Sequence, residues 1–208
     1  MVISVVGSGG KTTLIQRMAQ AYREQNKKVF VTTSTHMHIE PYTLVSDDAD
    51  SIVQELERTG FVMAGLAQGI KISPVSPETY ENVCAHADIV LVEADGSRCL
   101  PLKFPNRTEP VIYPNTDEII VVCGLHALGK PAREVCHRWE LVQACLGISE
   151  DTIITPEHIR TLVTQGYLIP LREKYPDKTI TLHPSNDGSP EQIAITNWLI
   201  DTTKYAKE

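Results

Sequence analysis

The residues best suited to chemistry lie at the start of the chain, in a glycine-rich loop that is followed by a lysine and two threonines. In order, they are Gly7, Ser8, Gly9, Gly10, Lys11, Thr12 and Thr13. Glycines allow the backbone to turn several N–H groups toward an anion, and the first turn of a following helix supplies further N–H groups. A lysine at this position can bridge the outer phosphates of a nucleotide, while a threonine hydroxyl can hold Mg²⁺. We therefore expect these residues to bind a nucleotide, with Lys11 also in a catalytic role and Thr12 as a metal ligand.

The loop is a short version of the usual Walker A loop, in which four residues separate the first glycine from the Gly-Lys pair. Val5 stands where that first glycine would be. The form resembles the Gly-Thr-X-Gly-Lys-Thr-Thr loop of the Mur ligase family more than the loop of typical GTPases. A glycine turn that merely joins a strand to a helix is the alternative, but Lys-Thr-Thr at the helix start favours phosphate binding.

A pair of carboxylates follows a second apolar run. Residues 89–92 are all apolar, and Glu93 and Asp95 come shortly after them. Four consecutive apolar residues predict a buried parallel strand, whose carboxyl end lies at the edge of the sheet where ligands bind. This is the expected form of a Walker B element, in which one carboxylate holds Mg²⁺ and the other positions or deprotonates a nucleophile. Glu93 and Asp95 are therefore both candidates for the metal site and for catalysis.

Hydroxyl and imidazole groups follow the strand predicted over residues 28–33. Residues 32–38 contain four hydroxyl side chains and two histidines. At the carboxyl end of a parallel strand these groups would lie near the phosphates, so His36 is a candidate for positioning the nucleophile. The hydroxyls could orient a water or supply a second metal ligand. A Ser/Thr turn with exposed histidines is the structural alternative.

Three cations, Arg98, Lys103 and Lys130, are further candidates for nucleotide binding. Arg98 and Lys103 follow the carboxylates on a proline-bounded loop, and Lys130 ends a loop that contains two glycines. Each could contact phosphate or an anionic substrate, with ordinary surface charge as the alternative. Cys136 and His137 are adjacent on a predicted helix, where neighbouring side chains point about 100° apart. We therefore do not expect them to share a metal ion.

The elements that position these residues alternate between strands and helices, which predicts an α/β fold with a mostly parallel sheet. We expect a P-loop NTPase-like three-layer sandwich, with residues 61–66 and 69–73 as a hairpin at the sheet edge. At 208 residues the chain is the size of one large domain, so residues 1–208 are expected to form a single nucleotide-binding domain. The other predicted strands cover residues 1–6, 28–33, 88–92, 117–125 and 179–183. The predicted helices run from 14 to 26, from 46 past 56, from 77 to 87, from 133 to 146, from 156 to 166 and from 190 to 198.

Charge and cysteine content argue against several classes of partner. The formal net charge is -7 and the 19 basic residues form no run, which disfavours nucleic-acid binding. No apolar stretch approaches the roughly 20 residues needed to span a bilayer. Five cysteines without a Cys-x-x-Cys pair suggest reduced thiols rather than disulfides. We therefore expect a cytoplasmic protein without membrane or nucleic-acid partners.

Motifs spread along most of the chain resemble, in order and together, those of the YqeC-like family. They cover residues 7–13, 32–36, 92–97 with 101–103, 109–112, 124–131, 137–138 and 154–157. This family consists of P-loop proteins usually described as accessory or cofactor-biosynthesis proteins of selenium-dependent molybdenum hydroxylases. The family tends toward an acidic residue where His126 stands, and toward Asn-x-x-Asp after a clean last strand where this chain has residues 182–187. No role in base recognition is therefore carried over to that last loop.

The resemblance implies a protein that binds ATP, with GTP left open, together with Mg²⁺. It strengthens His36, Arg98, Lys103, His137 and Arg138 as site residues, because each matches a motif position. The leading hypothesis is hydrolysis or phosphoryl transfer, by a P-loop NTPase or an ATP-dependent ligase or kinase, in maturation of a selenium-dependent molybdenum hydroxylase or its cofactor. The implied partners are the nucleotide, an unknown small-molecule or protein substrate, and the hydroxylase. The alternative is a nucleotide-gated accessory protein that docks on the hydroxylase with little turnover of its own.

Overall fold

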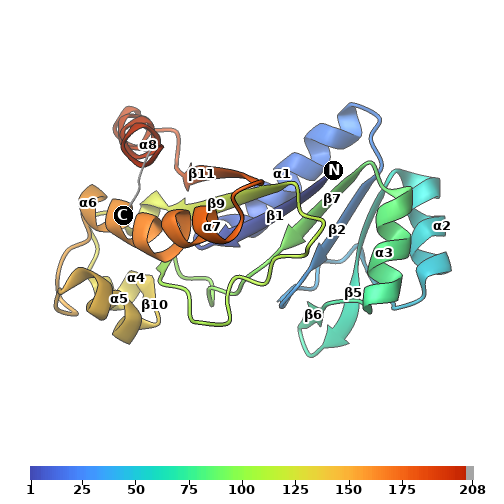
Figure 1. Cartoon of the computed structure of the whole chain (residues 1–208), viewed down its shortest axis with the longest axis horizontal. Helices are drawn as coiled ribbons and strands as arrows, with labels where there is room; N and C mark the ends of the chain where they lie inside the picture. The colour runs from blue at the N-terminus through green and yellow to red at the C-terminus, as the bar shows by residue number, and fades with distance from the viewer. Residues whose placement is uncertain (205–208) are drawn as a thin grey trace. The chain divides into compact units, whose positions relative to one another are not determined.

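In a computed structural model of the chain, which describes residues 1–204, strands and helices form two compact units (Figure 1). The first unit comprises Met1–Val5, Thr12–Gly96 and Val111–Glu118. The second comprises Val6–Lys11, Ser97–Pro110 and the chain from Ile119 onward. The mixed α/β class with a mostly parallel sheet is confirmed. The P-loop NTPase-like architecture and the single domain over residues 1–208 stay predictions.

Parallel strands form the middle of the first unit. In sheet order they are β1 (Val2–Gly7, whose last two residues belong to the second unit), β7 (Ile89–Glu93), β2 (Val29–Thr33) and β5 (Phe61–Gln68). Every residue of β2 and β7 is buried, as expected for parallel strands that helices cover on both faces. The register places Glu93 between Val5 and Thr33, so the carboxylate predicted at the strand end is confirmed at that place.

The predicted edge hairpin is confirmed, although its first strand also belongs to the parallel sheet. The first half of β5 pairs in parallel with β2, and its second half pairs antiparallel with β6 (Lys71–Ser73). The turn therefore lies at residues 69–70 instead of 67–68. Residues 62–65 are buried, whereas residues 66–68 are exposed, which lets one strand serve both pairings. Two short strands complete this edge, β3 (Met37–His38) beside β6 and β4 (Thr43–Val45) beside β5.

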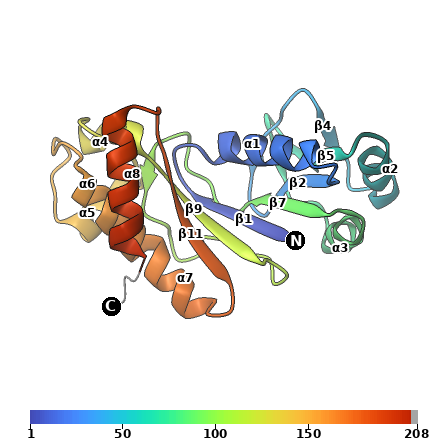
Figure 2. The same cartoon turned by 90° about the horizontal axis from the view of Figure 1, so that it is seen from above.

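Three helices accompany these strands: α1 (Lys11–Glu24), α2 (Ala49–Thr59) and α3 (Pro77–His86). Figure 2 shows α1 and α3 on opposite sides of β7 and β2. Side chains cap the starts of α2 and α3, because Asp48 accepts from the N–H of Ser51 and Ser76 from the N–H of Thr79. The buried face of α2 carries Ile52 and Leu56, at helical spacing.

The second unit contains two pairs of strands and most of the remaining helices. Strand β9 (Glu118–Gly124) neighbours β11 (Thr179–Ser185), and β8 (Leu102–Lys103) pairs in parallel with β10 (Cys136–His137). The helices are η1 (Leu125–Ala127), α4 (Ala132–Val135), α5 (Trp139–Leu146), α6 (Pro156–Val163), the π-helical turn η2 (Thr164–Leu168), α7 (Ile169–Lys174) and α8 (Pro190–Thr203).

The helix predicted over residues 133–146 is wrong, because strand β10 interrupts it. Cys136 and His137 pair with Leu102 and Lys103 of β8, and Arg138 then adopts a left-handed conformation with φ of 60°. The argument from helical spacing therefore does not apply to Cys136 and His137, whose side chains point to opposite faces in a strand. That they do not share a metal ion stays a prediction. Within residues 1–204 no group of three or more His, Cys, Asp or Glu side chains could hold a metal ion.

The helix that was expected to close near Gly166 instead continues through η2 and α7 to Lys174. A side chain at Gly166 would place its Cβ 2.9 Å from Cδ of Pro105 and 3.3 Å from Cδ2 of Phe104. Glycine at this position therefore permits close packing inside a helix and does not end it.

Candidate functional site

The glycine loop after β1 is built into the second unit by backbone contacts. The N–H of Ser8 donates to the carbonyl of Val122 (2.9 Å), and its hydroxyl donates to the carbonyl of Pro101 (3.0 Å). Gly7 has a φ of 94°, and a Cβ there would lie 2.1 Å from the carbonyl oxygen of Val122. Only glycine fits this position, both for its backbone conformation and for the space available.

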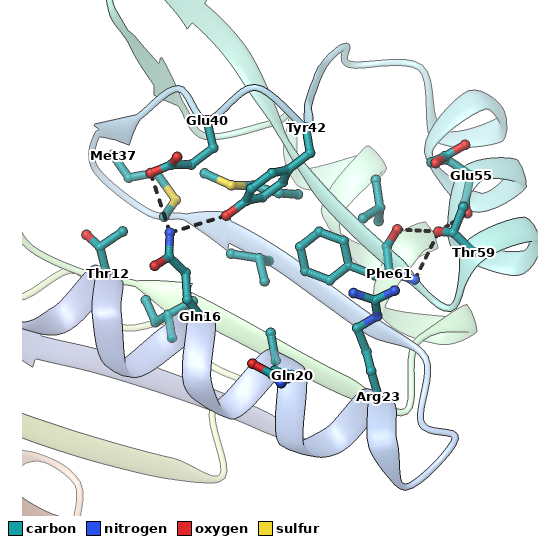
Figure 3. A pocket seen from close by; sticks show the side chains of 15 residues that line it. Thr12, Gln16, Gln20, Arg23, Met37, Glu40, Tyr42, Glu55, Thr59 and Phe61 are labelled. Carbon is teal, nitrogen blue, oxygen red and sulfur yellow. Dashed lines mark hydrogen bonds between the residues drawn. The ribbon is translucent and has the colours of Figure 1, made fainter.

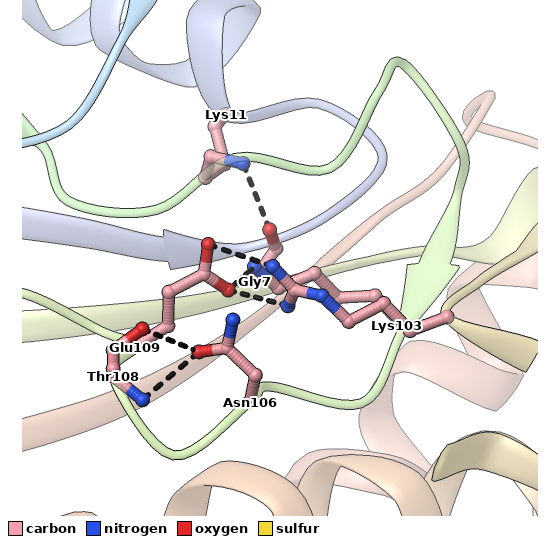
Figure 4. Close-up of polar contacts among 7 residues, drawn as sticks. Gly7, Lys11, Lys103, Asn106, Thr108 and Glu109 are labelled. Carbon is pink, nitrogen blue, oxygen red and sulfur yellow. Dashed lines mark hydrogen bonds and ion pairs between the residues drawn. The ribbon is translucent and has the colours of Figure 1, made fainter. Parts of the chain in front are cut away.

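Lys11 folds back over this loop. It is the first residue of α1 and only 4% exposed, and its Nζ donates to the carbonyl oxygen of Gly7 at 2.8 Å (Figure 4). Gly10, directly before it, has a φ of 137°, and a Cβ there would meet Oγ of Ser185 at 2.7 Å. An ammonium group above a glycine turn, at the N-terminus of a 14-residue helix, is a donor set that fits a phosphate group.

In the first unit, Thr12 and Glu93 meet as the sequence predicts. The Thr12 hydroxyl donates to Oε2 of Glu93 at 3.0 Å, and Glu93 is only 7% exposed. The backbone carbonyl of Glu93 accepts hydrogen bonds from the N–H of Ser34 and the hydroxyl of Thr33, which fixes the strand end. Asp95, two residues farther on, is fully buried. A hydroxyl beside carboxylate oxygens is a set of hard ligands that fits Mg²⁺, which keeps several waters of its own.

The hydroxyl side chains at the end of β2 and on the loop after it differ in whether they have a hydrogen-bond partner. Thr32 donates to the carbonyl of Ala64, and Ser34 donates to that of Val111. These two hydroxyls bond distant segments and do not form the local turn of the structural alternative. Only Thr33 matches that alternative, because its hydroxyl accepts from the N–H of Thr35 at 3.0 Å. The Thr35 hydroxyl oxygen is buried, and within residues 1–204 it has no hydrogen-bond partner. The sequence does not distinguish the four hydroxyls from one another. Thr35 differs only in that its buried hydroxyl has no partner among the described residues.

His36 lies on the loop between β2 and β3, where it is exposed to solvent. The first unit thus brings Thr12 and Glu93 together, and it leaves His36 at the surface of the same loop that buries Thr35. A part in positioning a nucleophile stays a prediction for His36.

The predicted cations lie in different environments. Arg98 and Lys130 are exposed, as is Thr13 at the start of α1. The Lys103 side chain is completely buried, and its Nζ lies 2.9 Å from Oε2 of Glu109 (Figure 4). Lys103 is therefore part of a structural ion pair, which the sequence did not reveal.

Glu109 joins Lys103 to Arg138, and we call these three residues the ion cluster. Arg138 donates to both carboxylate oxygens of Glu109, one through each terminal guanidinium nitrogen. Burial alone would raise the pKa of Glu109, but the hydrogen bonds from Arg138 and Lys103 outweigh it and lower that pKa to about 2. Glu109 therefore stays ionised throughout the neutral range. In the sequence, Glu109 stands only within a family motif, and no pattern around it predicts a role.

His137 borders the ion cluster, because it pairs with Lys103 across β8 and β10. Burial lowers the pKa of His137, and the nearby charges of Arg138, Lys103 and Arg98 lower it further. These effects favour the neutral form of its imidazole. Its Nδ1 is buried and has no hydrogen-bond partner among the described residues.

The loop over residues 124–131 is held by backbone hydrogen bonds. The N–H of Gly129 donates to the carbonyl of Ile154, and the N–H of Ile154 donates to the carbonyl of Lys130. These bonds tie the loop to the segment before α6. Across residues 1–204, none of the helices has the length and apolar character needed to cross a bilayer.

Comparison with known proteins places the same residues in a family context. The family model described as "YqeC protein" matches residues 3–140, a span that contains the glycine loop, Glu93, Asp95 and the ion cluster. A curated protein of Escherichia coli strain K12, named "Uncharacterized protein YqeC", is 32% identical over 174 residues. That match covers 78% of this chain and 67% of the bacterial protein.

Proposed function

The chain belongs to the YqeC protein family, and we propose that it binds ATP with Mg²⁺ and hydrolyses it or transfers its terminal phosphoryl group. The observation that carries the proposal is the 2.8 Å contact between Lys11 Nζ and the carbonyl of Gly7. It places a buried ammonium group over a glycine turn at a helix start, where nucleotide phosphates are bound in P-loop proteins.

Each site residue has a role in this proposal. Lys11 and the loop N–H groups stabilise the charge that develops on the transferred phosphoryl group. Thr12 and Glu93 hold Mg²⁺, which neutralises phosphate charge when it is bound. Because Glu93 already bonds Thr12, Asp95 and His36 are the groups proposed to position the nucleophile.

The exposed cations Arg98 and Lys130 are proposed to contact phosphate or an anionic second substrate. Lys103 is already bonded to Glu109, so we assign it to holding Glu109 in place instead of contacting phosphate or substrate directly. The proposed biological role, in the cytoplasm, is maturation of a selenium-dependent molybdenum hydroxylase or its cofactor, with that hydroxylase as partner. Its support is the motif resemblance.

An enzyme is favoured over a nucleotide-gated accessory protein by the loop over residues 124–131. In the accessory alternative, the conformation of this loop would control docking on the hydroxylase. However, backbone hydrogen bonds hold Gly129 and Lys130 to Ile154. A segment held in this way suits a fixed wall of a site better than a switch.

The experiment that tests the proposal is a thermal-shift panel of ATP, GTP, CTP and their diphosphates, each with and without Mg²⁺. A ligand that binds only the folded state raises Tm by mass action, by RT ln(1 + [L]/Kd) in free energy. We expect the largest rise with ATP and Mg²⁺, and release of inorganic phosphate or transfer to a second substrate in the same samples. An unchanged Tm with every nucleotide would overturn the proposal.

A further inference from the structure

The first unit contains a cavity of about 600 Å³ that runs along α1 (Figure 3). Helix α1 forms one wall of the cavity, with Thr12 at one end of this wall and Arg23 at the other. The connection between β3 and β4 forms the facing wall with Glu40 and Tyr42. A volume of this size falls within the range of pockets that enclose small molecules.

The floor of the cavity is apolar and protected from water. Its residues Ile15, Val31, Met37, Val62 and Met63 are each at most 3% exposed. Two of them are methionines, whose polarisable thioethers make favourable contacts with aromatic rings. This floor fits the face of a flat ring.

Aromatic side chains shape the part of the cavity toward Arg23. Tyr42 and Phe61 meet edge to face, with ring centroids 5.7 Å apart. The guanidinium of Arg23 lies over the Phe61 ring at 5.2 Å from its centroid. Such a corner offers a further ring both aromatic edges and an aromatic face.

A polar bridge crosses the cavity between its two walls. Nε2 of Gln16, on α1, donates to the hydroxyl of Tyr42 (3.2 Å) and to Oε1 of Glu40 (3.5 Å). These contacts use the amide hydrogens of Gln16, so its amide oxygen and the Glu40 carboxylate are the acceptors on this bridge. Acceptors of this kind recognise N–H groups. The lining contains two acids, Glu40 and Glu55, and one cation, Arg23. Because Glu55 is paired with Arg58, the charges of Glu40 and Arg23 balance each other, which favours a neutral ligand.

We propose that this cavity binds a neutral heteroaromatic small molecule that carries amine or amide N–H groups. The ring lies on the Met37 and Met63 floor against Phe61, and its N–H groups are bound by Gln16 and Glu40. Because Thr12 closes one end of the cavity, the bound molecule lies beside the proposed metal ligand. Its role as second substrate rests on the proposed function, whereas the binding site itself does not.

The four methionines of the chain allow a test with internal references. In a methyl NMR spectrum of the protein labelled at methionine methyl groups, Met37 and Met63 report on the cavity, whereas Met1 and Met18 lie outside its lining. The probe is 4-quinazolinone, a bicyclic lactam with an amide N–H. We expect it to shift the Met37 and Met63 resonances in a saturable way in the millimolar range, which is usual for so small a ligand. Met1 and Met18 should not shift.

Matched variants separate recognition of the N–H groups from simple apolar binding. Gln16→Ala should weaken binding of 4-quinazolinone about tenfold, since an acceptor and the bridge are lost. Gln25→Ala is the control. Gln25 lies just beyond the end of α1, where its side chain donates to the carbonyl of Ala21, and it does not line the cavity. Quinoline, which has no N–H group, should bind the wild type about as weakly as 4-quinazolinone binds Gln16→Ala.

Two results overturn the inference: no shift of Met37 or Met63 with 4-quinazolinone, or equal shifts of all four methionines. A separate measurement distinguishes it from the proposed function. Lys11→Ala should lose the effect of ATP on Tm while it keeps the shifts of Met37 and Met63. Loss of those shifts in Lys11→Ala, with the fold intact, would contradict a cavity that binds independently of the loop.

Discussion

The ion cluster of the second unit differs from a group of polar residues in the first unit, Thr12, Thr35 and Glu93, which we call the hydroxyl site. The two differ in how far their polar groups are paired with other protein groups. In the ion cluster, two cations share one carboxylate, and these bonds fix three segments of the chain to one another. In the hydroxyl site, the Thr12 hydroxyl donates to one carboxylate oxygen of Glu93, and the Thr35 hydroxyl has no hydrogen-bond partner among residues 1–204. Groups that are saturated by protein atoms contribute to stability, whereas groups with remaining capacity can bind a ligand. Substitutions in the two places should therefore have different readouts.

The largest expected effect is on stability and comes from the ion cluster. Glu109→Gln leaves the completely buried Lys103 without its carboxylate partner at this position, so the free energy of unfolding should fall by about 3 kcal/mol. Urea denaturation followed by circular dichroism measures it. The matched control is Glu57→Gln, since Glu57 pairs with Lys28 at 2.8 Å but both side chains are more than a third exposed. Glu57→Gln should lower the free energy of unfolding by less than about 1 kcal/mol. Equal losses in the two variants would contradict a special contribution of the buried ion cluster to stability.

The second effect is the acid sensitivity of the same cluster. The pKa of Glu109 is about 2 in the folded chain against an ordinary value of 4.5. A lowered pKa means that the carboxylate contributes stability fully above about pH 4.5 and loses it as pH falls toward 2. After a discount for partial exposure, about 2 kcal/mol should disappear across this window.

Urea denaturation of wild type and Glu109→Gln at pH 5 and pH 3 isolates this contribution. The difference in unfolding free energy between the two proteins should shrink as the pH falls. A difference that stays constant between these pH values would show that Glu109 does not have a lowered pKa.

The third effect belongs to the hydroxyl site and appears in binding. Thr12→Val removes the hydroxyl that bonds Glu93 but keeps the shape of the side chain, so the free energy of unfolding should fall by about 1 to 2 kcal/mol, less than for Glu109→Gln. Binding of ATP with Mg²⁺ should weaken about tenfold or more, because a metal ligand is lost. Thr12→Ser keeps the hydroxyl and should bind as the wild type does. Titration calorimetry of the three proteins checks this, and unchanged affinity in Thr12→Val would argue against Thr12 as a ligand.

The smallest effect compares Thr33, the last residue of β2, with Thr35 on the loop that follows. Thr33→Val breaks the 2.7 Å hydrogen bond to the carbonyl of Glu93 and should cost about 1 kcal/mol of stability. Thr35→Val removes a buried hydroxyl without a partner in the described chain and should be neutral or slightly stabilising. Denaturation of both variants gives the comparison. A loss in Thr35→Val as large as that in Thr33→Val would mean that Thr35 already has a structural partner.

Local patterns were sufficient to predict much of the fold and the first part of the site. The apolar run before Glu93 predicted β7, and helices were predicted from 46 past 56 and from 77 to 87, where α2 and α3 lie. Each of these features depends on residues that are close in sequence. The meeting of Thr12 and Glu93 followed as well, because a glycine loop and a strand end were expected at the same edge of a parallel sheet.

The remaining features depend on contacts between distant residues, which periodicity cannot reveal. Pairing of Cys136 with Leu102 turned a predicted helix into a strand. Gly166 was taken as a helix end, although its missing side chain only accommodates Pro105. The buried state of Lys103 follows from Glu109 and Arg138, which lie 6 and 35 residues away in the sequence. Charge type was visible in the sequence, but the partner of each charge was not.

Titration calorimetry of ATP with Mg²⁺ into wild type, Lys11→Ala and Lys27→Ala tests the central claim most directly. Lys11 lies over its glycine loop, whereas Lys27 is an exposed lysine beyond the end of the same helix. We predict that wild type and Lys27→Ala bind alike and that Lys11→Ala binds at least about tenfold more weakly, since a charge-assisted contact to phosphate is lost. Equal binding by all three proteins, or no binding by the wild type, would contradict the assignment of this loop as a nucleotide site.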